Sequence, residues 1–378
     1  MGVIALRMLF GDRAKYLGLV FGVAFSTLLI AQQGGLFVGL MLRTASVIDD
    51  AQEVDIWVMD PQADYIDTVR ALRDTELPRV RGVAGVDWAV PFFKTNLALK
   101  TLEGHIENAM MLGLDDASLI GATSRFLLGS LEDLRRPDAI AIDAAGYKRL
   151  WPGETPRLGR ELELNDHRAV IAAITDASAA FTANIIMHAP YSRAIAYAPQ
   201  GRNQLSFILA RAAPGRTPDD VARAITAQTG LQALSAAAFR WKTIDFFLTH
   251  TGIPISFGTV IVLGIIVGVA VVGLTFNIFV AENIRQYGAL KAMGLSDLGL
   301  VGLVLLQAAV VGMIGYGIGL GAAAGFFSFA TEGELRGFYL PVWVAWTVAG
   351  MVGLIMLMAT VASLRRVLVL DPAIVFRS

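Results

Sequence analysis

The sequence contains no cysteine and few charged residues. The absence of cysteine from its 378 residues excludes disulfides, thiolate metal sites and cysteine nucleophiles. Charged residues make up 17% of the chain, whereas an ordinary soluble domain carries about 25%. The net charge is −1, so nothing indicates a nucleic-acid partner. Some segments of the chain must therefore contain few or no charged residues.

The common catalytic motifs are also missing. The four histidines, His105, His167, His188 and His250, are far apart and form no H-E-x-x-H or His-x-His pair. No G-x-S-x-G motif supports a serine hydrolase. No G-x-x-x-x-G-K-[ST] loop is present, so ATP hydrolysis by the P-loop route is not expected of this sequence. We therefore expect neither a catalytic residue nor a metal site.

Four long stretches contain no Asp, Glu, Lys, Arg or His. They are residues 16–42, residues 251–281, the segment between Asp297 and Glu332, and the segment between Arg336 and Arg365. About 20 apolar residues in a helix cross a bilayer, so each stretch predicts a transmembrane helix. Four such stretches in the core of one soluble protein would be rare.

The first stretch has an alternative interpretation as a signal peptide, because basic residues precede it. It is too long for the apolar part of such a peptide, and no small-x-small cleavage site follows, so we expect an uncleaved anchor. Basic residues flank the helices on one side, at Arg7, Arg13, Lys15, Arg285, Lys291, Arg365, Arg366 and Arg377. The positive-inside rule then places both termini in the cytoplasm and residues 43–250 outside.

Residues 43–250 hold most of the charge and predict a folded α+β domain. Residues 54–59 (VDIWVM) are rich in strand formers and end at the turn signal Asp60-Pro61. Apolar residues at a three-residue spacing predict a helix over 66–72. Alternation over 93–99 predicts a strand with Lys94 on its wet face.

A second β-α-β unit closes this domain. Residues 205–210 predict a strand, and Thr217 and Pro218 suit the N-cap and first position of a helix. Gly230 ends that helix, and 231–234 return as a strand. Two such units around a β-rich middle predict two lobes.

The link between the second and third membrane helices reads ENIRQYGALKAMG over 282–294. Ile284, Tyr287, either Leu290 or Lys291, and Gly294 follow a helical spacing with polar residues between them. This pattern predicts a short amphipathic helix at the cytoplasmic membrane face. Its composition alone favours equally a helix that only connects the two membrane helices and a helix that docks onto another protein.

Residues 285–294 resemble the R-E-x-G-x-L-[KR]-A-[IM]-G stretch of MacB/FtsX-like ABC transporter permeases. Asp371-Pro372-Ala373-Ile374 resembles the D-P-[AV] tail of that family, and the one-plus-three layout of helices is also similar. Residues 55–61 (DIWVMDP) are similar to the DevC branch, whose permeases lack a fused ATPase. The resemblance implies a type VII exporter fold with four transmembrane helices and a two-lobed external domain.

The resemblance also implies that the short link is a coupling helix seated in a groove of a separate ABC ATPase dimer. The residues of that helix are Glu282, Arg285, Gln286, Tyr287, Gly288, Leu290, Lys291, Met293 and Gly294. Gln286 stands where the family usually has glutamate, so a charge contact there is not implied. ATP and magnesium would bind the partner, and this chain would hold no cofactor.

Further expectations follow from the family. It implies a homodimer in a bacterial inner membrane that transmits ATP-driven motion and exports a lipophilic cargo (glycolipid, lipid, peptide or drug). A HlyD-type adaptor and an outer-membrane channel are the expected further partners. Two alternatives share the layout: an FtsX-like signal transducer and a lipoprotein-releasing permease.

Glycines in the third membrane helix form two rows at a four-residue spacing. Gly317, Gly321 and Gly325 make one row, and Gly315, Gly319 and Ala323 make its neighbour. Small residues at this period allow close helix approach in lipid. The rows predict packing within the chain or a seam between two copies.

These inferences divide the chain as follows. The predicted parts are a cytoplasmic segment 1–15, membrane helix 16–42, external domain 43–250 (one lobe of about 43–100 with 190–250, a second of about 101–190), membrane helix 251–281, coupling segment 282–297, membrane helix 298–331, external loop 332–338, membrane helix 339–364 and cytoplasmic tail 365–378.

Overall fold

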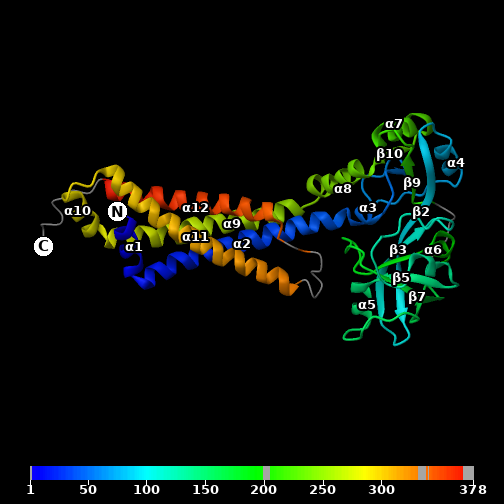
Figure 1. The fold of residues 1–378 in the computed structure, drawn as a ribbon, viewed down its shortest axis with the longest axis horizontal. Helices are drawn as coiled ribbons and strands as arrows, with labels where there is room; N and C mark the ends of the chain where they lie inside the picture. The colour runs from blue at the N-terminus through cyan, green and yellow to red at the C-terminus, as the bar shows by residue number, and fades with distance from the viewer. Residues whose placement is uncertain (1, 199–204, 331–337, 339, 369–378) are drawn as a thin grey trace. The chain divides into compact units, whose positions relative to one another are not determined.

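The computed structural model describes residues 2–198, 205–330, 338 and 340–368 (Figure 1). The chain divides into a helical unit, residues 1–39 and 252–378, and a globular unit, residues 40–251. The external loop 332–338, apart from Phe338, and the tail motif at 371–374 lie outside the described residues.

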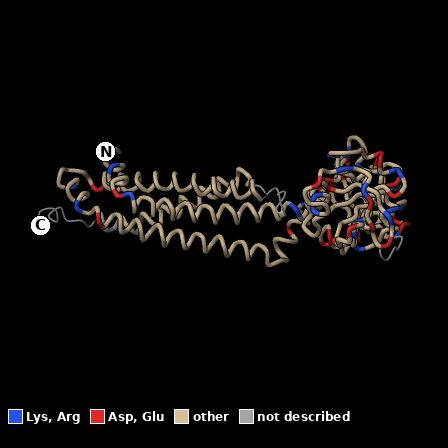
Figure 2. Tube along the Cα trace, turned by 90° about the horizontal axis from the view of Figure 1, so that it is seen from below, with Lys and Arg blue, Asp and Glu red and all other residues tan. Residues whose placement is uncertain are grey.

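The helical unit holds the long apolar helices. Its elements are α1 (Gly2–Gly11), α2 (Arg13–Thr44, which continues into the globular unit), α9 (Ile253–Glu282), α10 (Ile284–Ala292), α11 (Asp297–Ala330) and α12 (Val342–Leu368). Four of them, α2, α9, α11 and α12, are long and apolar enough to cross a membrane. Figure 2 shows that charged residues on these helices gather near their ends. The four predicted membrane helices are confirmed.

Glycines of α9 and α11 pack closely against side chains of α2. A Cβ built on Gly268 of α9 would lie 2.6 Å from the Oγ of Ser26, and one built on Gly315 of α11 would lie 2.6 Å from the Cβ of Val23. Ser26 and Thr27 donate their hydroxyl hydrogens to backbone carbonyls one turn earlier, so no polar group of theirs is left unpaired in the interface. Small residues therefore set the packing distance, as is usual where helices approach closely in a membrane.

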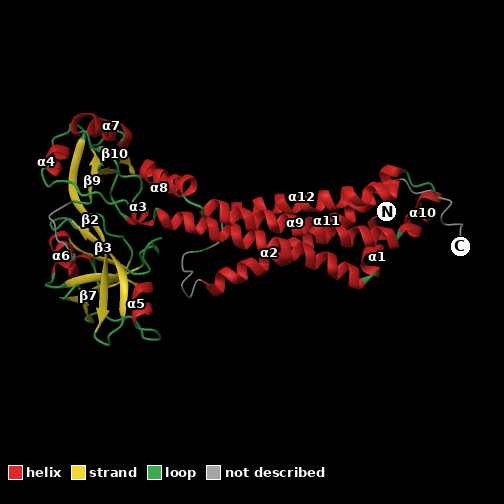
Figure 3. Cartoon of the chain, turned by 180° about the vertical axis from the view of Figure 1, so that it is seen from behind, coloured by secondary structure: helices red, strands yellow, loops and turns green. Residues whose placement is uncertain are grey.

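The globular unit contains all the strands of the described residues (Figure 3). Its helices are α3 (Ser46–Asp50), α4 (Glu76–Arg81), the 3₁₀ turn η1 (Leu131–Arg135), α5 (Ala144–Leu150), α6 (Tyr191–Tyr197), α7 (Pro218–Thr229) and α8 (Ala236–His250). Its strands are β1 (Ile56–Met59), β2 (Val86–Thr101), β3 (Ile106–Leu114), β4 (Phe126–Leu128), β5 (Ala139–Asp143), β6 (Glu161–Leu164), β7 (His167–Thr175), β8 (Ile186–Pro190), β9 (Phe207–Ala212) and β10 (Gln232–Ser235).

The strands form one path in the order β10-β1-β9-β2-β3-β8-β5-β7-β4, with β6 beside β2 and β7. The long strand β2 belongs to two sheets, because its first half pairs with β9 and its second half pairs with β3. One apolar core lies under β1, β9, β10, α4 and α7, and another lies among β3, β5, β7, β8 and α5. Two lobes therefore share a single strand, and the mixed α/β class is confirmed.

Trp57 is the centre of an aromatic cluster in the first lobe. Its ring lies 5.4 Å from Phe92, 5.5 Å from Phe207 and 5.7 Å from Phe239 of α8, and all four side chains are buried. Alternate residues of β1 face the opposite core, so the whole strand is buried. This cluster fixes α8 to the sheet of the first lobe.

Local sequence signals correctly predicted where α7 of this lobe begins and ends. Thr217 accepts a hydrogen bond from the backbone N–H of Asp220, and Gly230 ends α7 with a φ of 76°. The helix predicted over 66–72 is wrong. Leu72 instead pairs as a β-bridge with Leu205, because long-range contacts override the helical spacing.

The prediction of Lys94 on a wet face is also wrong. Its side chain is 4% exposed and forms an ion pair with Asp67. The backbone N–H of Lys94 donates to Ser206 at the point where β2 passes from one sheet to the other. The change of partner strand at this point buries a position that simple alternation leaves exposed.

His188 of β8 gives the globular unit a pH dependence. The side chain is 3% exposed, and burial lowers its pKa to about 4. The unfolded chain binds a proton near pH 6.5, whereas the folded chain resists it, so stability falls as the pH drops from 7 toward 4. We expect about 2 kcal/mol of destabilisation by pH 5 from this residue alone.

Thermal unfolding of the full chain in detergent at pH 7.5 and pH 5 measures this effect. His188→Leu should lose part of the acid sensitivity, whereas His167→Asn, at an exposed position, should keep it. Equal acid sensitivity in the wild type and in His188→Leu would contradict a buried neutral histidine.

Candidate functional site

Helix α10 begins directly after α9 because Asn283 serves both helices. The Asn283 side chain donates to the Phe279 carbonyl at 2.8 Å, and its own carbonyl accepts from the N–H of Gln286 at 3.0 Å. The membrane helix therefore ends and the short helix starts within one residue. The predicted amphipathic helix is present, over Ile284–Ala292.

Tyr287 anchors α10 inside the helical unit. The side chain is fully buried, and its hydroxyl donates to the Oε1 of Gln307 in α11 at 2.8 Å. The Nε2 of Gln307 donates in turn to the backbone carbonyl of Ala5 in α1 at 3.0 Å. Burial raises the pKa of Tyr287 to about 12, which disfavours loss of the phenol proton still further. One buried chain of hydrogen bonds thus joins α10, α11 and α1.

The end of α10 is fixed by a turn into α11. Gly294 adopts a φ of 94°, a conformation that favours glycine, and the N–H of Leu295 donates to the Leu290 carbonyl at 3.1 Å. Lys291 forms an ion pair with Asp297 at the first residue of α11, at 2.8 Å. The turn returns the chain to the next membrane helix within four residues.

The start of α10 is tied to the first membrane helix. Glu282, the last residue of α9, forms an ion pair with Lys15 of α2, and Lys15 also pairs with Asp12 at 2.5 Å. The residue that ends α9 just before α10, and Lys291 near the end of α10, are therefore both paired with neighbouring helices of the same unit.

The described residues of the chain leave one face of α10 and its turn uncovered. Arg285 and Gln286 are exposed, and Met293 is 76% exposed. Beside Met293 lies an apolar hollow of about 230 Å³, lined by Ile4, Leu290, Met293, Gly294, Leu295 and Leu303. Methionine is flexible and apolar, and such side chains are common on surfaces that bind other proteins.

The nine residues predicted for this site fall into two groups. Tyr287 and Gly288 are buried against the chain itself, and Leu290 is partly buried and lines the hollow. The other six are at least partly accessible and lie at the ends or on the outer face of the helix. No sequence pattern singled out Gln307, although a lone glutamine in an uncharged membrane stretch is itself a signal.

The two glycine rows of α11 face different surroundings. A Cβ on Gly315 or Gly319 would collide with α2, whereas a Cβ on Gly317, Gly321 or Gly325 would meet no atom within 4 Å. The second row therefore lies on a helix face that the described residues of this chain leave open.

Comparisons with known proteins identify both parts of the chain. The FtsX-like permease C-terminal family matches residues 258–372, and the MacB-like periplasmic core domain family matches residues 16–228, which is more than half of the chain. No curated protein sequence matches.

Similar solved structures include the extracellular domain of the noncanonic ABC-type transporter YknZ from Gram-positive bacteria. That domain shares 13% sequence identity with this chain, and the TM-score is 0.35. The match covers 48% of this chain and 98% of that domain. The periplasmic region of MacB from Actinobacillus actinomycetemcomitans shares 11% identity with a TM-score of 0.37, over 54% and 96%. A domain of a putative permease from Porphyromonas gingivalis shares 14% sequence identity with a TM-score of 0.30. The match covers 48% of this chain and 86% of that domain.

The two family matches follow each other along the chain and cover the anchor helix, the mixed α/β domain and the three later membrane helices. A short helix, one face of which the described residues leave open, joins α9 to α11, where the sequence resembles the family motif. The chain therefore belongs to the MacB/FtsX-like family of ABC transporter permeases.

Proposed function

We propose that this chain is the permease subunit of an exporter, in which a separate ABC ATPase dimer binds α10 and drives movement of the extracytoplasmic domain. The observation that carries the proposal is the buried contact of Tyr287 with Gln307, which fixes α10 to α11 and α1. A helix attached in this way moves its neighbours when it is pushed. ATP and magnesium bind the ATPase, and this chain supplies no catalytic group.

The arrangement across the membrane supports the proposal. The basic residues near α1, α10 and the end of α12 favour the cytoplasmic side, which supports a cytoplasmic location for both termini. Trp343 and Trp346, at the other end of α12, are 59% and 73% exposed, as suits residues of an interfacial aromatic belt. Residues 43–250 then lie in the periplasm of a bacterial inner-membrane protein.

A second copy of the chain is the proposed neighbour of the open glycine row at Gly317, Gly321 and Gly325. Small residues at this spacing allow two membrane helices to approach closely. The two copies match the two subunits of the ATPase. By family analogy, the cargo is lipophilic and leaves through a HlyD-type adaptor and an outer-membrane channel.

The exposed face of α10 provides a direct test of ATPase binding. Met293→Asp puts a charge on an apolar contact and should weaken binding of the ATPase about tenfold, since burial of one methionine contributes about 1.5–3 kcal/mol. Met293→Leu keeps the apolar surface and should bind normally. Stimulated ATPase activity of the reconstituted complex, titrated with the permease, measures both variants.

Normal stimulation by Met293→Asp together with Arg285→Glu would contradict docking at this face. Both residues are exposed, so a loss of binding is separable from a loss of folding.

Purification from native membranes tests the export role. Recovery of an ATPase with an adaptor supports export, and light scattering of the same complex reports the number of permease copies. Recovery of a cell-wall amidase without any adaptor would contradict export and favour signalling.

A further inference from the structure

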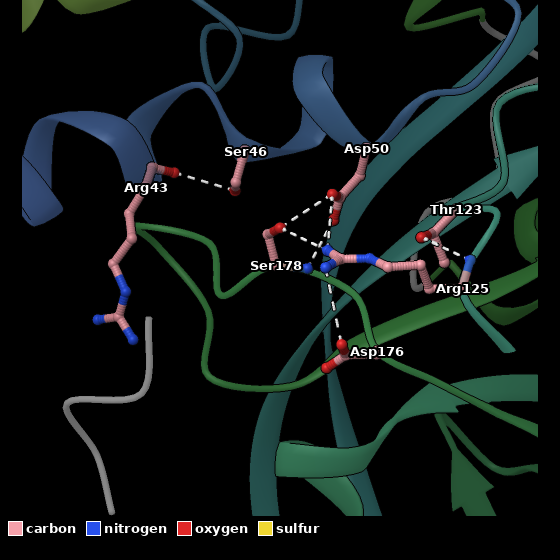
Figure 4. A network of polar contacts seen from close by, with 7 residues as sticks. All are labelled: Arg43, Ser46, Asp50, Thr123, Arg125, Asp176 and Ser178. Carbon is pink, nitrogen blue, oxygen red and sulfur yellow. Dashed lines mark hydrogen bonds and ion pairs between the residues drawn. The ribbon is translucent and has the colours of Figure 1, made fainter. Parts of the chain in front are cut away.

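Helix α3 connects the first membrane helix to both lobes of the globular unit. α2 ends at Thr44, and α3 begins at Ser46, whose hydroxyl donates to the Arg43 carbonyl at 3.0 Å (Figure 4). Val47 and Ile48 are buried, so the short helix is packed rather than loose. α3 is therefore the element that directly follows the first membrane helix along the chain.

Asp50, at the end of α3, holds the second lobe. Its Oδ2 accepts from the backbone N–H of Ser178 at 2.6 Å, and its Oδ1 accepts from the Ser178 hydroxyl at 2.9 Å. Ser178 lies in the loop between β7 and β8 of that lobe. Hydrogen bonds to a carboxylate are about twice as strong as neutral ones, and two of them fix orientation as well as distance.

The second lobe presents a prepared site for this carboxylate. Arg125 lies 3.7 Å from both Asp50 and Asp176, and it donates to the Ser178 hydroxyl at 3.3 Å. The N–H of Asp176 donates to the Arg125 carbonyl at 2.9 Å, which fixes the position of the arginine. Figure 4 shows these groups converging on Asp50, whereas the Arg43 side chain points away.

The neighbouring carboxylate contacts the other lobe. Asp49 forms an ion pair with Arg240 of α8 at 3.0 Å, and α8 is fixed to the first lobe through Phe239 and Trp57. The side chain of Asp49 is 44% exposed, whereas that of Asp50 is 16% exposed. An exposed pair contributes little, so Asp50 makes the stronger of the two attachments.

We propose that Asp50 is a positioning residue that holds the second lobe on α3, so that movement of the first membrane helix carries this lobe with it. The inference rests on the proposed function, because it assigns a contact through which ATP-driven motion reaches the second lobe in addition to the shared strand β2. The contact requires one carboxylate with two acceptor atoms, which Asp50 supplies to Ser178.

The absence of native cysteine permits a direct measurement of this contact. Spin labels at Glu132→Cys in the second lobe and Asp245→Cys on α8 occupy exposed positions, and pulsed EPR reports the distance between them. In the full chain bound to its ATPase, Asp50→Ala should broaden this distance distribution about twofold without nucleotide, because both acceptor atoms are lost. The ATP-dependent shift of the distance should fall by half or more in the same variant.

Two further variants separate positioning from folding. Asp50→Asn keeps one acceptor oxygen and should restore part of the shift, and the matched control Asp49→Ala should behave as wild type. Ser178→Ala keeps the backbone donor, and it should give an intermediate broadening even where Asp50→Ala fails to fold. A distribution and shift equal to wild type in both Asp50→Ala and Ser178→Ala would overturn the inference. A wild-type distance that ATP does not change would contradict the proposed function instead.

Discussion

Gly319→Ala is expected to destabilise the helical unit by about 1–3 kcal/mol, the usual cost of overpacking a tight interface. A Cβ at this position would collide with the backbone oxygen of Ala24 and lie 2.6 Å from the Cβ of Thr27. A backbone oxygen cannot rotate away as a flexible side chain can, so α2 and α11 must separate. Gly319→Leu should prevent stable insertion or folding.

Gly302→Ala is the matched control, because it adds the same methyl group to the same helix where no atom lies within 4 Å and outside the proposed contact between two copies. Folding of this variant should be unchanged or slightly improved, since alanine favours a helix over glycine. Thermal unfolding in detergent compares the two variants at equal protein concentration. Equal unfolding temperatures for Gly319→Ala and wild type would show that α2 and α11 are not packed as described.

The order of membrane helices and external domain was predictable because the apolar interior of a membrane strongly disfavours charged residues. A charged residue inside a membrane helix is costly, so four uncharged stretches identify four helices without any tertiary information. Local rules also sufficed at Thr217 and Gly230, where a side-chain cap and a left-handed backbone decide the ends of α7.

Local rules failed where distant segments decide the structure. The helical spacing over 66–72 is real, but Leu72 pairs with Leu205, which is far away along the chain. Lys94 lies on a strand that alternates correctly, yet the strand changes partners at that residue and buries it with Asp67. No periodicity encodes the partner of a strand.

The candidate site divides in the same way. A motif located α10, and the helical spacing of Tyr287 and Leu290 correctly predicted an amphipathic helix. The partner of Tyr287 was not predictable, because Gln307 is brought to it only when α11 packs beside α10 and α1. The contact between Asp50 and Ser178 was also not predictable from the sequence, because the two residues lie 128 positions apart along the chain.

Tyr287→Phe and Gln307→Leu are each expected to cost about 1–3 kcal/mol of stability, because each leaves a buried polar partner unpaired. Tyr287→Phe leaves the Oε1 of Gln307 without its donor, and Gln307→Leu leaves the tyrosine hydroxyl and the Ala5 carbonyl without their contacts. The double variant removes both polar side chains, so its loss should be clearly smaller than the sum of the single losses. Thermal unfolding of the four proteins completes this double-mutant cycle.

Function should respond differently from stability in this series. All three variants cut the hydrogen-bonded connection between α10 and α1, so each should bind the ATPase while transmitting less of its motion. ATP turnover would then continue with a reduced ATP-dependent distance change between Glu132→Cys and Asp245→Cys labels. The double variant is decisive, because it loses less stability than the sum of the two single changes while the connection stays broken. A wild-type distance change in that variant would mean that packing around Tyr287 transmits the motion and that the hydrogen bonds to Gln307 serve only to satisfy buried polar atoms.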